Sequence, residues 1–297
     1  MKSLKVLITI LIMFLSTTHI FSEEEKSYQV KLTRVYQVGQ KFSTTKSFNH
    51  TKVTKITSQG KVLKEKKKEF SAKTEGTLTV LEIDELKGKV KFEFLVKFLS
   101  KKEDGKDTYK ELIPEGTRIL FGTTDSFKIN GKYVNKSENE VLDIFFSLPS
   151  LMDSEDFAFG TKDSKTIGSI WEVNKNEVAK LTAYKSFKMD SKDITGSTIF
   201  KKIQIVDGNK CLKYFTDITI GKISVKERKG MKTIKSTLEI NLEKVVPADV
   251  TSNIVNIKKE NLKLVYKGKR ILNANSRVLN SELIVSLSKA SKQILIK

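Results

Sequence analysis

Regular alternation between polar and large apolar side chains constrains this chain more than any other feature. It is clearest in residues 87–98, which read KGKVKFEFLVKF. Because successive side chains of a β-strand point to opposite faces, the five Val and Phe residues of this segment would share one face. The other face would carry lysine and glutamate, with Leu95 as the exception. We expect the Val/Phe face to cover a sheet interior and the lysine face to be solvated.

Similar alternation recurs along the whole chain. The segments that read as strands are residues 28–36, 78–83, 199–206, 211–220, 223–226, 236–246, 254–267 and 278–287. Asn130-Gly131 predicts a tight hairpin turn, since these residue types tolerate positive φ angles, and Asp207-Gly208 joins two further strands. The pattern predicts a mainly β fold of curved antiparallel sheets, with two half-barrel-like modules as one possible arrangement.

One segment, near residues 138–147, predicts a short helix instead. Ser137 and Glu140 match a capping box, with Ser137 as the N-cap and Glu140 at the third helical position. An apolar side follows, and Leu148-Pro149 would end the helix. We interpret this helix as a plug that packs on the sheet; a lid over a ligand cavity is the alternative.

The chain divides into two halves of related character. Residues 23–150 predict an N-terminal β module, residues 151–165 a junction, and residues 166–297 a C-terminal β module, although one continuous domain fits equally well. Each half contains a glycine followed three residues later by an aromatic residue. These steps are Gly39 to Phe42 and Gly168 to Trp171. They suggest a duplicated module.

The N-terminus has the layout of a secretory signal peptide. Lysines at positions 2 and 5 precede an apolar run from Val6 to Leu15, about half the length that spans a bilayer. We expect cleavage after Ser22 and no membrane-spanning segment in the mature chain. With one cysteine, Cys211, the fold has no intrachain disulfide, which favours a bacterial envelope location, periplasmic or extracellular.

The excess of positive charge does not indicate nucleic-acid binding. The chain has 55 basic and 35 acidic residues, a formal net charge of +20, and its basic residues are almost all lysine. Arginine is preferred for bidentate phosphate and base recognition. The lysines are also spread along the whole chain. We expect solvated lysine faces, with affinity for an anionic envelope surface as the alternative, and no nucleic-acid partner.

Several chemistries are disfavoured by the residues present. After signal cleavage His50 is the single histidine, which together with Cys211 cannot supply a usual zinc site or a supported catalytic triad. No phosphate-binding glycine loop is present, and we expect no cofactor and no metal. The junction carries the carboxylates of Asp153, Glu155, Asp156 and Asp163. We interpret them as a solvated acidic loop; a glycosidase-like pair or a calcium site is the alternative.

The junction and the segment after it also carry a family resemblance. Pro149 is followed by Ile167-Gly168 and Trp171, a Val/Ile-Gly-x-x-Trp step that precedes a run of long strands. In this the chain resembles uncharacterised families of bacterial exported β-rich proteins, over about residues 28–246. It is more distantly similar to half-barrel envelope proteins that carry lipoproteins or lipids. The resemblance implies export and a β fold, and it identifies no catalytic residue.

These observations favour an exported, non-enzymatic β-protein that binds an apolar or amphiphilic envelope ligand, a lipid or a lipoprotein. Aromatic side chains supply the candidate ligand-binding face. They are Phe92, Phe94, Phe98, Phe145, Trp171 and Tyr214. The same aromatics could simply form the core, because each buries on the order of 150–250 Å². The alternative is a structural or surface-interaction protein that contacts anionic polysaccharide or another envelope protein.

Overall fold

A computed structural model of the protein describes residues 26–33, 36–84, 89–122, 126–146, 155–182, 187–225, 232–272 and 277–296. The predicted signal peptide (residues 1–22) and the predicted helix end at Leu148-Pro149 lie outside these residues. The helices are α2 (Lys136–Phe146), α3 (Glu155–Phe159) and α4 (Lys175–Thr182), with a 3-10 turn η1 (Ser191–Asp193). The strands are β1 (Lys41–Ser58), β2 (Lys61–Asp84), β3 (Lys89–Glu103), β4 (Lys110–Ile113), β5 (Arg118–Gly122), β6 (Lys128–Ile129), β7 (Lys132–Tyr133), β8 (Ile170–Glu172), β9 (Phe187–Met189), β10 (Ile194–Val206), β11 (Asn209–Ile220), β12 (Ile223–Val225), β13 (Lys232–Pro247), β14 (Val255–Leu272) and β15 (Arg277–Leu295).

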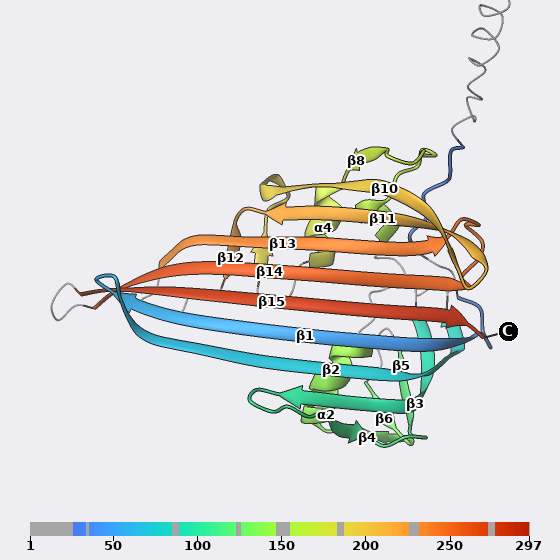
Figure 1. The fold of residues 1–297 in the computed structure, drawn as a ribbon, viewed down its shortest axis with the longest axis horizontal. Coiled ribbons are helices and arrows are strands. Elements are labelled where there is room, and N and C mark those ends of the chain that lie inside the picture. The colour runs from blue at the N-terminus through green and yellow to red at the C-terminus, as the bar shows by residue number, and fades with distance from the viewer. Residues whose placement is uncertain are drawn as a thin grey trace, which may run out of the picture.

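One large antiparallel sheet dominates the fold (Figure 1). Within the described residues it contains 13 strands in the order β7-β6-β5-β3-β2-β1-β15-β14-β13-β11-β10-β8, with β4 paired to β3. The sheet is open, because β7 and β8 lie at its two ends, and β9 pairs separately with β12. The predicted mainly β fold of curved antiparallel sheets is confirmed.

The first and last long strands of the chain lie side by side. β1 pairs with β15 in a continuous register from Phe42 opposite Leu295 to Thr57 opposite Asn280. Strands from both predicted modules therefore belong to one sheet. Starting from β8, the order runs through the C-terminal strands to β15 and continues with β1 through the N-terminal strands.

The two glycine steps have matching geometry. Gly39 and Gly168 both have φ of 87°, which glycine adopts without a steric penalty. Gly39 N donates to Val80 O at 2.9 Å, and Gly168 N donates to Phe200 O at 2.8 Å. In each case the accepting residue's own N–H donates to the residue after the glycine. The same turn thus attaches the start of each half to its neighbouring strand.

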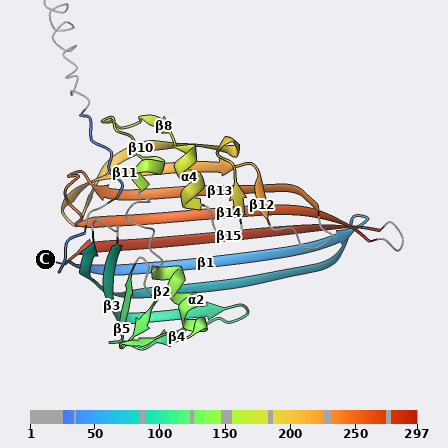
Figure 2. The same cartoon turned by 180° about the vertical axis from the view of Figure 1, so that it is seen from behind.

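The helices cover one face of the sheet, which we call the inner face (Figure 2). Two apolar clusters lie there. The first lies beneath α3 and α4 and includes Phe200, Leu212, Tyr214, Ile218, Ile240 and Leu264. The second lies beneath α2 and includes Phe42, Phe48, Phe92, Phe94, Phe121 and Phe146. Two cores therefore share one sheet.

Helix α2 begins earlier than the sequence pattern indicated. The reciprocal capping bonds join Asn135 and Glu138: Glu138 N donates to Asn135 Oδ1, and Asn135 N donates to Glu138 Oε2, both at 2.9 Å. Ser137 lies inside the helix. The predicted cap at Ser137 and Glu140 is wrong by two residues, because Asn135 and Glu138 have the same spacing and Asn is as good an N-cap as Ser.

A β-bulge interrupts the alternation in β3. Glu75 of β2 pairs with Phe98, but the next residue, Gly76, pairs with Val96, so Lys97 is an extra residue. The bulge exchanges the faces of the residues that follow it. Phe98 is 37% exposed, whereas Leu99 is fully buried. The prediction that Phe98 shares the face of the other Val and Phe residues is therefore wrong.

The position of Gly76 is crowded and gives a stability prediction. A Cβ atom at this residue would overlap the carbonyl of Leu95 and the ring of Phe94. We expect Gly76→Ala to lower the free energy of unfolding by about 2–3 kcal/mol, because strand backbone must move. Gly221→Ala is the control, since its Cβ would meet only Asp193 O at 3.6 Å. Urea denaturation should show a change within about 0.5 kcal/mol for the control. Equal effects of the two substitutions would contradict the close strand contact at Gly76.

Candidate functional site

The structure divides the predicted aromatic site residues between the two cores. Phe92, Phe94 and Phe145 belong to the cluster beneath α2. Tyr214 is buried in the cluster beneath α3 and α4, and Trp171 packs against it. Phe98 lies in neither cluster. The six residues therefore do not form one continuous face, and their role as ligand contacts stays a prediction.

Trp171 attaches α3 to the sheet. Its Nε1 donates to the carbonyl of Phe159 at 2.8 Å, and its ring meets that of Tyr214 edge-on with centroids 6.1 Å apart. These contacts account for the aromatic residue of the second glycine step. They hold the end of α3 over the first cluster.

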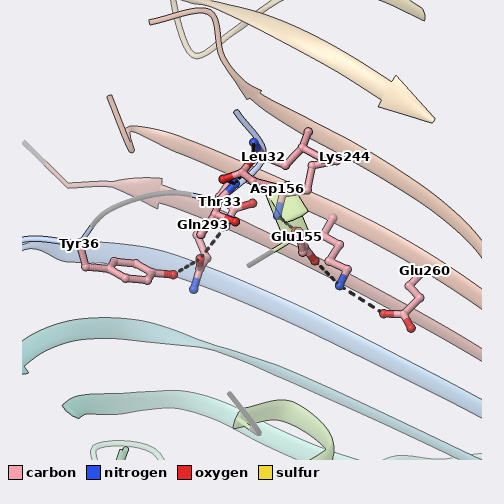
Figure 3. A network of polar contacts seen from close by, with 10 residues as sticks. Leu32, Thr33, Tyr36, Glu155, Asp156, Lys244, Glu260 and Gln293 are labelled. Atoms are coloured by element: carbon pink, nitrogen blue, oxygen red, sulfur yellow. Dashed lines mark hydrogen bonds and ion pairs between the residues drawn. The ribbon is translucent and has the colours of Figure 1, made fainter. Parts of the chain in front are cut away.

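A polar seam lies between the two apolar clusters on the inner face, and Figure 3 shows the part of it around Glu155. We use this name for Tyr36, Lys46, Glu155, Lys244, Lys258, Glu260, Lys289 and Gln293. All except Tyr36 and Glu155 come from the central strands β1, β13, β14 and β15. Tyr36 donates to Gln293 Oε1 at 3.4 Å, and burial raises the pKa of its phenol to about 12.

Glu155 holds the seam together by two ion pairs. Its Oε1 lies 2.7 Å from Lys258 Nζ, its Oε2 accepts a hydrogen bond from Lys244 Nζ, and Lys258 also lies 3.5 Å from Glu260. The Glu155 and Lys244 side chains are only 17% and 8% exposed. Burial alone would raise the pKa of Glu155, but the two ammonium groups outweigh it and hold that pKa well below its usual range.

Asp156, the next residue, fixes the N-terminal segment. Its Oδ1 accepts hydrogen bonds from the backbone N–H of Leu32 and, at 3.3 Å, of Thr33. The interpretation of the junction as a solvated acidic loop is therefore wrong for Glu155 and Asp156. It holds for Asp163, which is exposed, and Asp153 lies outside the described residues. The adjacent Glu155-Asp156 pair could have indicated the start of helix α3 in the sequence, because carboxylates in the first turn stabilise a helix.

Two lysines of the seam have no carboxylate within ion-pair distance among the described residues. Lys46 Nζ donates to Phe145 O at 2.6 Å and lies 4.8 Å from the centroid of the Phe146 ring. Lys289 Nζ lies 5.7 Å from the Phe48 ring. Burial, and then the nearby Lys289, lowers the pKa of Lys46 to about 8. Burial also lowers the pKa of Lys289, although Glu260 opposes this effect.

Beyond the seam, the long strands extend past α2 and α4 toward the β1–β2 turn at Gln59-Gly60 (Figures 1 and 2). We call this surface the distal inner face. Each of its rows crosses several strands. The strand register gives three such rows: Phe70–His50–Leu287–Leu262–Ile240, Lys68–Lys52–Val285–Leu264–Leu238 and Lys66–Thr54–Leu283–Tyr266–Ser236. The β13–β15 side is therefore mostly apolar, and the β1–β2 side is basic in the second and third rows. The side chains of β13 and β14 in these rows are mostly buried, so β15 supplies most of the accessible apolar side chains.

Charges on the distal half of β2 are sorted between the two faces of the sheet. Lys64, Lys66 and Lys68 alternate onto the inner face with Lys52 of β1, and no carboxylate pairs with any of these four among the described residues. The acidic residues of β2 point outward, where Glu65 pairs with Lys55 at 3.9 Å and Glu69 with Lys67 at 2.8 Å. Lys52 lies directly opposite Lys68, an arrangement that opposes folding.

An open depression of about 890 Å³ lies elsewhere, between α4 and η1. Its lining is charged, and two of its lysines are already paired, Lys180 with Glu177 at 2.7 Å and Lys192 with Asp190 at 2.6 Å. The described residues contain no group of three or more His, Cys, Asp or Glu side chains that could hold a metal ion. The distal inner face is therefore the stronger candidate for binding.

Comparisons with known proteins assign no family. No protein-family model and no curated protein matches the chain. Among solved structures, an outer membrane channel from Pseudomonas putida F1 covers 89% of this chain and 97% of its own, with 9% identity and a TM-score of 0.22. Pseudomonas aeruginosa OccK2 in complex with glucuronate covers 87% and 99%, with 8% identity and a TM-score of 0.17. Pseudomonas aeruginosa OpdQ covers 86% and 98%, with 7% identity and a TM-score of 0.17. These similarities are weak and establish no shared fold.

In the part of the chain that the structure describes, no helix has the length and apolar character needed to cross a membrane.

The Glu155 ion pairs give a second prediction. We expect Glu155→Gln to lower the free energy of unfolding by about 3 kcal/mol at neutral pH, because it leaves two buried ammonium groups without a counter-charge. The depressed pKa means that this stabilisation is present above the ordinary glutamate pKa and is lost as the pH falls toward the folded-state value. Glu177→Gln removes an exposed pair and should change stability by less than about 0.5 kcal/mol. Urea denaturation at several pH values tests both variants.

Lys46 gives the opposite prediction. Because its charged form is disfavoured in the folded protein, Lys46→Met should raise the free energy of unfolding by about 1 kcal/mol at pH 7. The folded-state pKa lies below the unfolded one, so the native lysine destabilises most below pH 8, and the advantage of methionine should shrink as the pH rises toward 10.5. Denaturation curves at pH 7 and pH 10 measure the difference. A lower stability at pH 7 would show that the ammonium contributes net favourable contacts.

Proposed function

We propose that this protein is a non-enzymatic component of a bacterial envelope that binds an anionic amphiphile, a lipid or the lipid part of a lipoprotein, on the distal inner face. The partly buried apolar side chains of β15 would contact the acyl portion, and the lysines of β1 and β2 would attract the anionic headgroups. The observation that carries the proposal is the change from apolar side chains on β15 to lysines on β1 and β2 along two of the three rows, those that contain Lys52 and Lys66.

The free energies of the individual contacts indicate that binding needs both the apolar side and the basic side of this surface. Each buried methylene group contributes about 0.8 kcal/mol, and one lysine near an anionic lipid surface contributes about 1 kcal/mol. A single short contact of either kind gives weak binding. Leu283, Val285 and Leu287 are only partly buried, so they can still lose accessible surface to a ligand. Lys52, Lys64, Lys66 and Lys68, which pair with no carboxylate among the described residues, supply the second contribution.

Export supports the envelope location in this proposal. The N-terminal sequence has the charge and apolar pattern of a secretory signal peptide, and the many lysines suit contact with anionic envelope surfaces. The resemblance to half-barrel envelope proteins that carry lipids or lipoproteins points the same way.

A second candidate function is surface interaction with anionic polysaccharide or another envelope protein. The unpaired distal edge of β2 favours it: residues 61–69 pair with β1 on one side only, and the pairing of β2 with β3 begins at Phe70. Such a role would use the lysines but not the apolar side chains of β15. The two functions therefore differ in their dependence on the apolar side of the face.

The proposed function predicts a face-specific loss of binding. We expect the triple variant K52Q/K66Q/K68Q to bind phosphatidylglycerol vesicles about tenfold or more weakly than the wild type, because three contacts with anionic headgroups are lost. The control is K55Q/K67Q/K263Q, which removes the same charge from the outer face and should bind nearly as tightly. Vesicle flotation at 150 mM salt measures both. Equal losses would indicate that only net charge matters.

The apolar half is tested separately. Leu283→Gln and Val285→Gln should weaken vesicle binding but leave binding to an anionic polysaccharide unchanged. A complementary experiment purifies the mature protein from its native envelope without detergent and identifies extracted lipids by mass spectrometry. A defined lipid near one per chain would support the amphiphile; a lipid-free folded protein that binds polysaccharide would favour the second function.

A further inference from the structure

The charges of the polar seam do not balance. Four lysines lie there, Lys46, Lys244, Lys258 and Lys289, with two glutamates. Glu155 pairs with Lys244 and Lys258, and Glu260 also pairs with Lys258. Glu260 attracts Lys289 from beyond ion-pair distance. Two positive charges therefore remain in excess at the centre of the inner face.

The two lysines without an ion pair among the described residues, Lys46 and Lys289, lie close together. Lys289 is directly opposite Phe48, and Lys46 is two residues from Phe48 on β1. Diagonal neighbours of this kind are roughly 7–8 Å apart, near enough for one anionic group to contact both side chains. Each ammonium interacts with the face of a phenylalanine ring. Lys46 also has a local structural role, since its ammonium donates to a carbonyl in the last turn of α2.

The carbonyl of Phe145 does not accept all the hydrogen bonds that the Lys46 ammonium can donate. A lysine ammonium has three N–H groups, and the single hydrogen bond of Lys46 uses one of them. A carbonyl is also a weaker partner than an anion for a charge removed from water. Both lysine residues are only partly buried, so a ligand on the distal inner face can reach them.

We propose that Lys46 and Lys289 together bind one anionic group, the phosphate or carboxylate end of the amphiphile. This inference rests on the proposed function and adds the position and orientation of the ligand. From Lys289, the same face of β15 continues with Leu287, Val285 and Leu283. The six residue steps from Lys289 to Leu283 span roughly 20 Å toward the turn at Gln59-Gly60. The anionic end lies beneath α2 and the acyl chain runs along β15. The exposed lysines of β1 and β2 attract the anionic surface from which the ligand is taken.

The test separates the bound molecule from the membrane surface. Oleate and 1-oleoyl-lysophosphatidate present a carboxylate and a phosphate on the same chain, and oleyl alcohol presents neither. We expect the wild-type protein to bind both anionic ligands more tightly than the alcohol. K46M/K289M should lose about tenfold or more in affinity for the anions and none for the alcohol, because charge-assisted hydrogen bonds are removed. K46R/K289R should retain most of the affinity. The preferred anion identifies the headgroup chemistry.

The chemical reactivity of Lys46 provides a second measurement. Competitive acetylation, followed by peptide mass spectrometry, reports the pH at which each lysine becomes neutral. We expect the midpoint for Lys46 to rise by about one pH unit or more when oleate is bound, whereas Lys55 on the outer face should not change.

The outcomes distinguish the two proposals. Binding of the anionic ligands with full affinity by K46M/K289M, with an unchanged Lys46 midpoint, would overturn the inference and leave the proposed function standing. No binding of any of the three ligands by the wild type, together with no vesicle binding, would overturn both.

Discussion

Pairing of β1 with β15 is the interaction on which the rest of the structure depends. It joins strands from opposite ends of the chain over a continuous register and makes one sheet of the two halves. The paired residues lie far apart in the sequence, from Phe42 opposite Leu295 to Thr57 opposite Asn280, so the entropy of closing the intervening segment must be offset by many strand pairs at once. This pairing also places the inner faces of β1 and β15 between the two apolar clusters, where the polar seam lies.

The exposed inner surface follows from a difference in length between strands and helices. β2 has 24 residues and extends roughly 80 Å at the usual rise of a strand. Helices α2 and α4 have 11 and 8 residues, which correspond to about 16 Å and 12 Å. Helices of this size cover only part of such strands. The described helices lie over the two cores, and β1, β2, β14 and β15 continue beyond them (Figure 2).

The amino-acid pattern predicts which side chains of a single strand share a face better than it predicts how the strands pair with one another. Alternation located most of the strands, and Asn130-Gly131 and Asp207-Gly208 form the expected turns with positive φ. The bulge at Lys97 could not be read from β3 alone, because it depends on the partner residues Glu75 and Gly76. The cap of α2 failed for a different reason, since two overlapping segments have the same capping pattern.

The candidate site depended still more on long-range pairing. The lysine-rich segment of β2 is visible in the sequence, but its relation to the apolar residues of β15 requires the register across β1. Lys52, for example, lies between Lys68 and Val285, which are separated by more than 200 positions in the chain. The aromatic residues were the more conspicuous signal, and most of them belong to the two cores.

The distribution of charge on the distal strands is best understood as a departure from what stability alone favours. On the outer face Glu65 and Glu69 each find a lysine, which shows that this segment can place opposite charges together. On the inner face Lys52 and Lys68 oppose each other, and Lys46 and Lys289 lie without a paired carboxylate among the described residues. Like charges at neighbouring positions disfavour the folded chain in the absence of a counter-charge. An anionic ligand would supply that counter-charge from outside the protein, and its binding would then stabilise the strands that bind it.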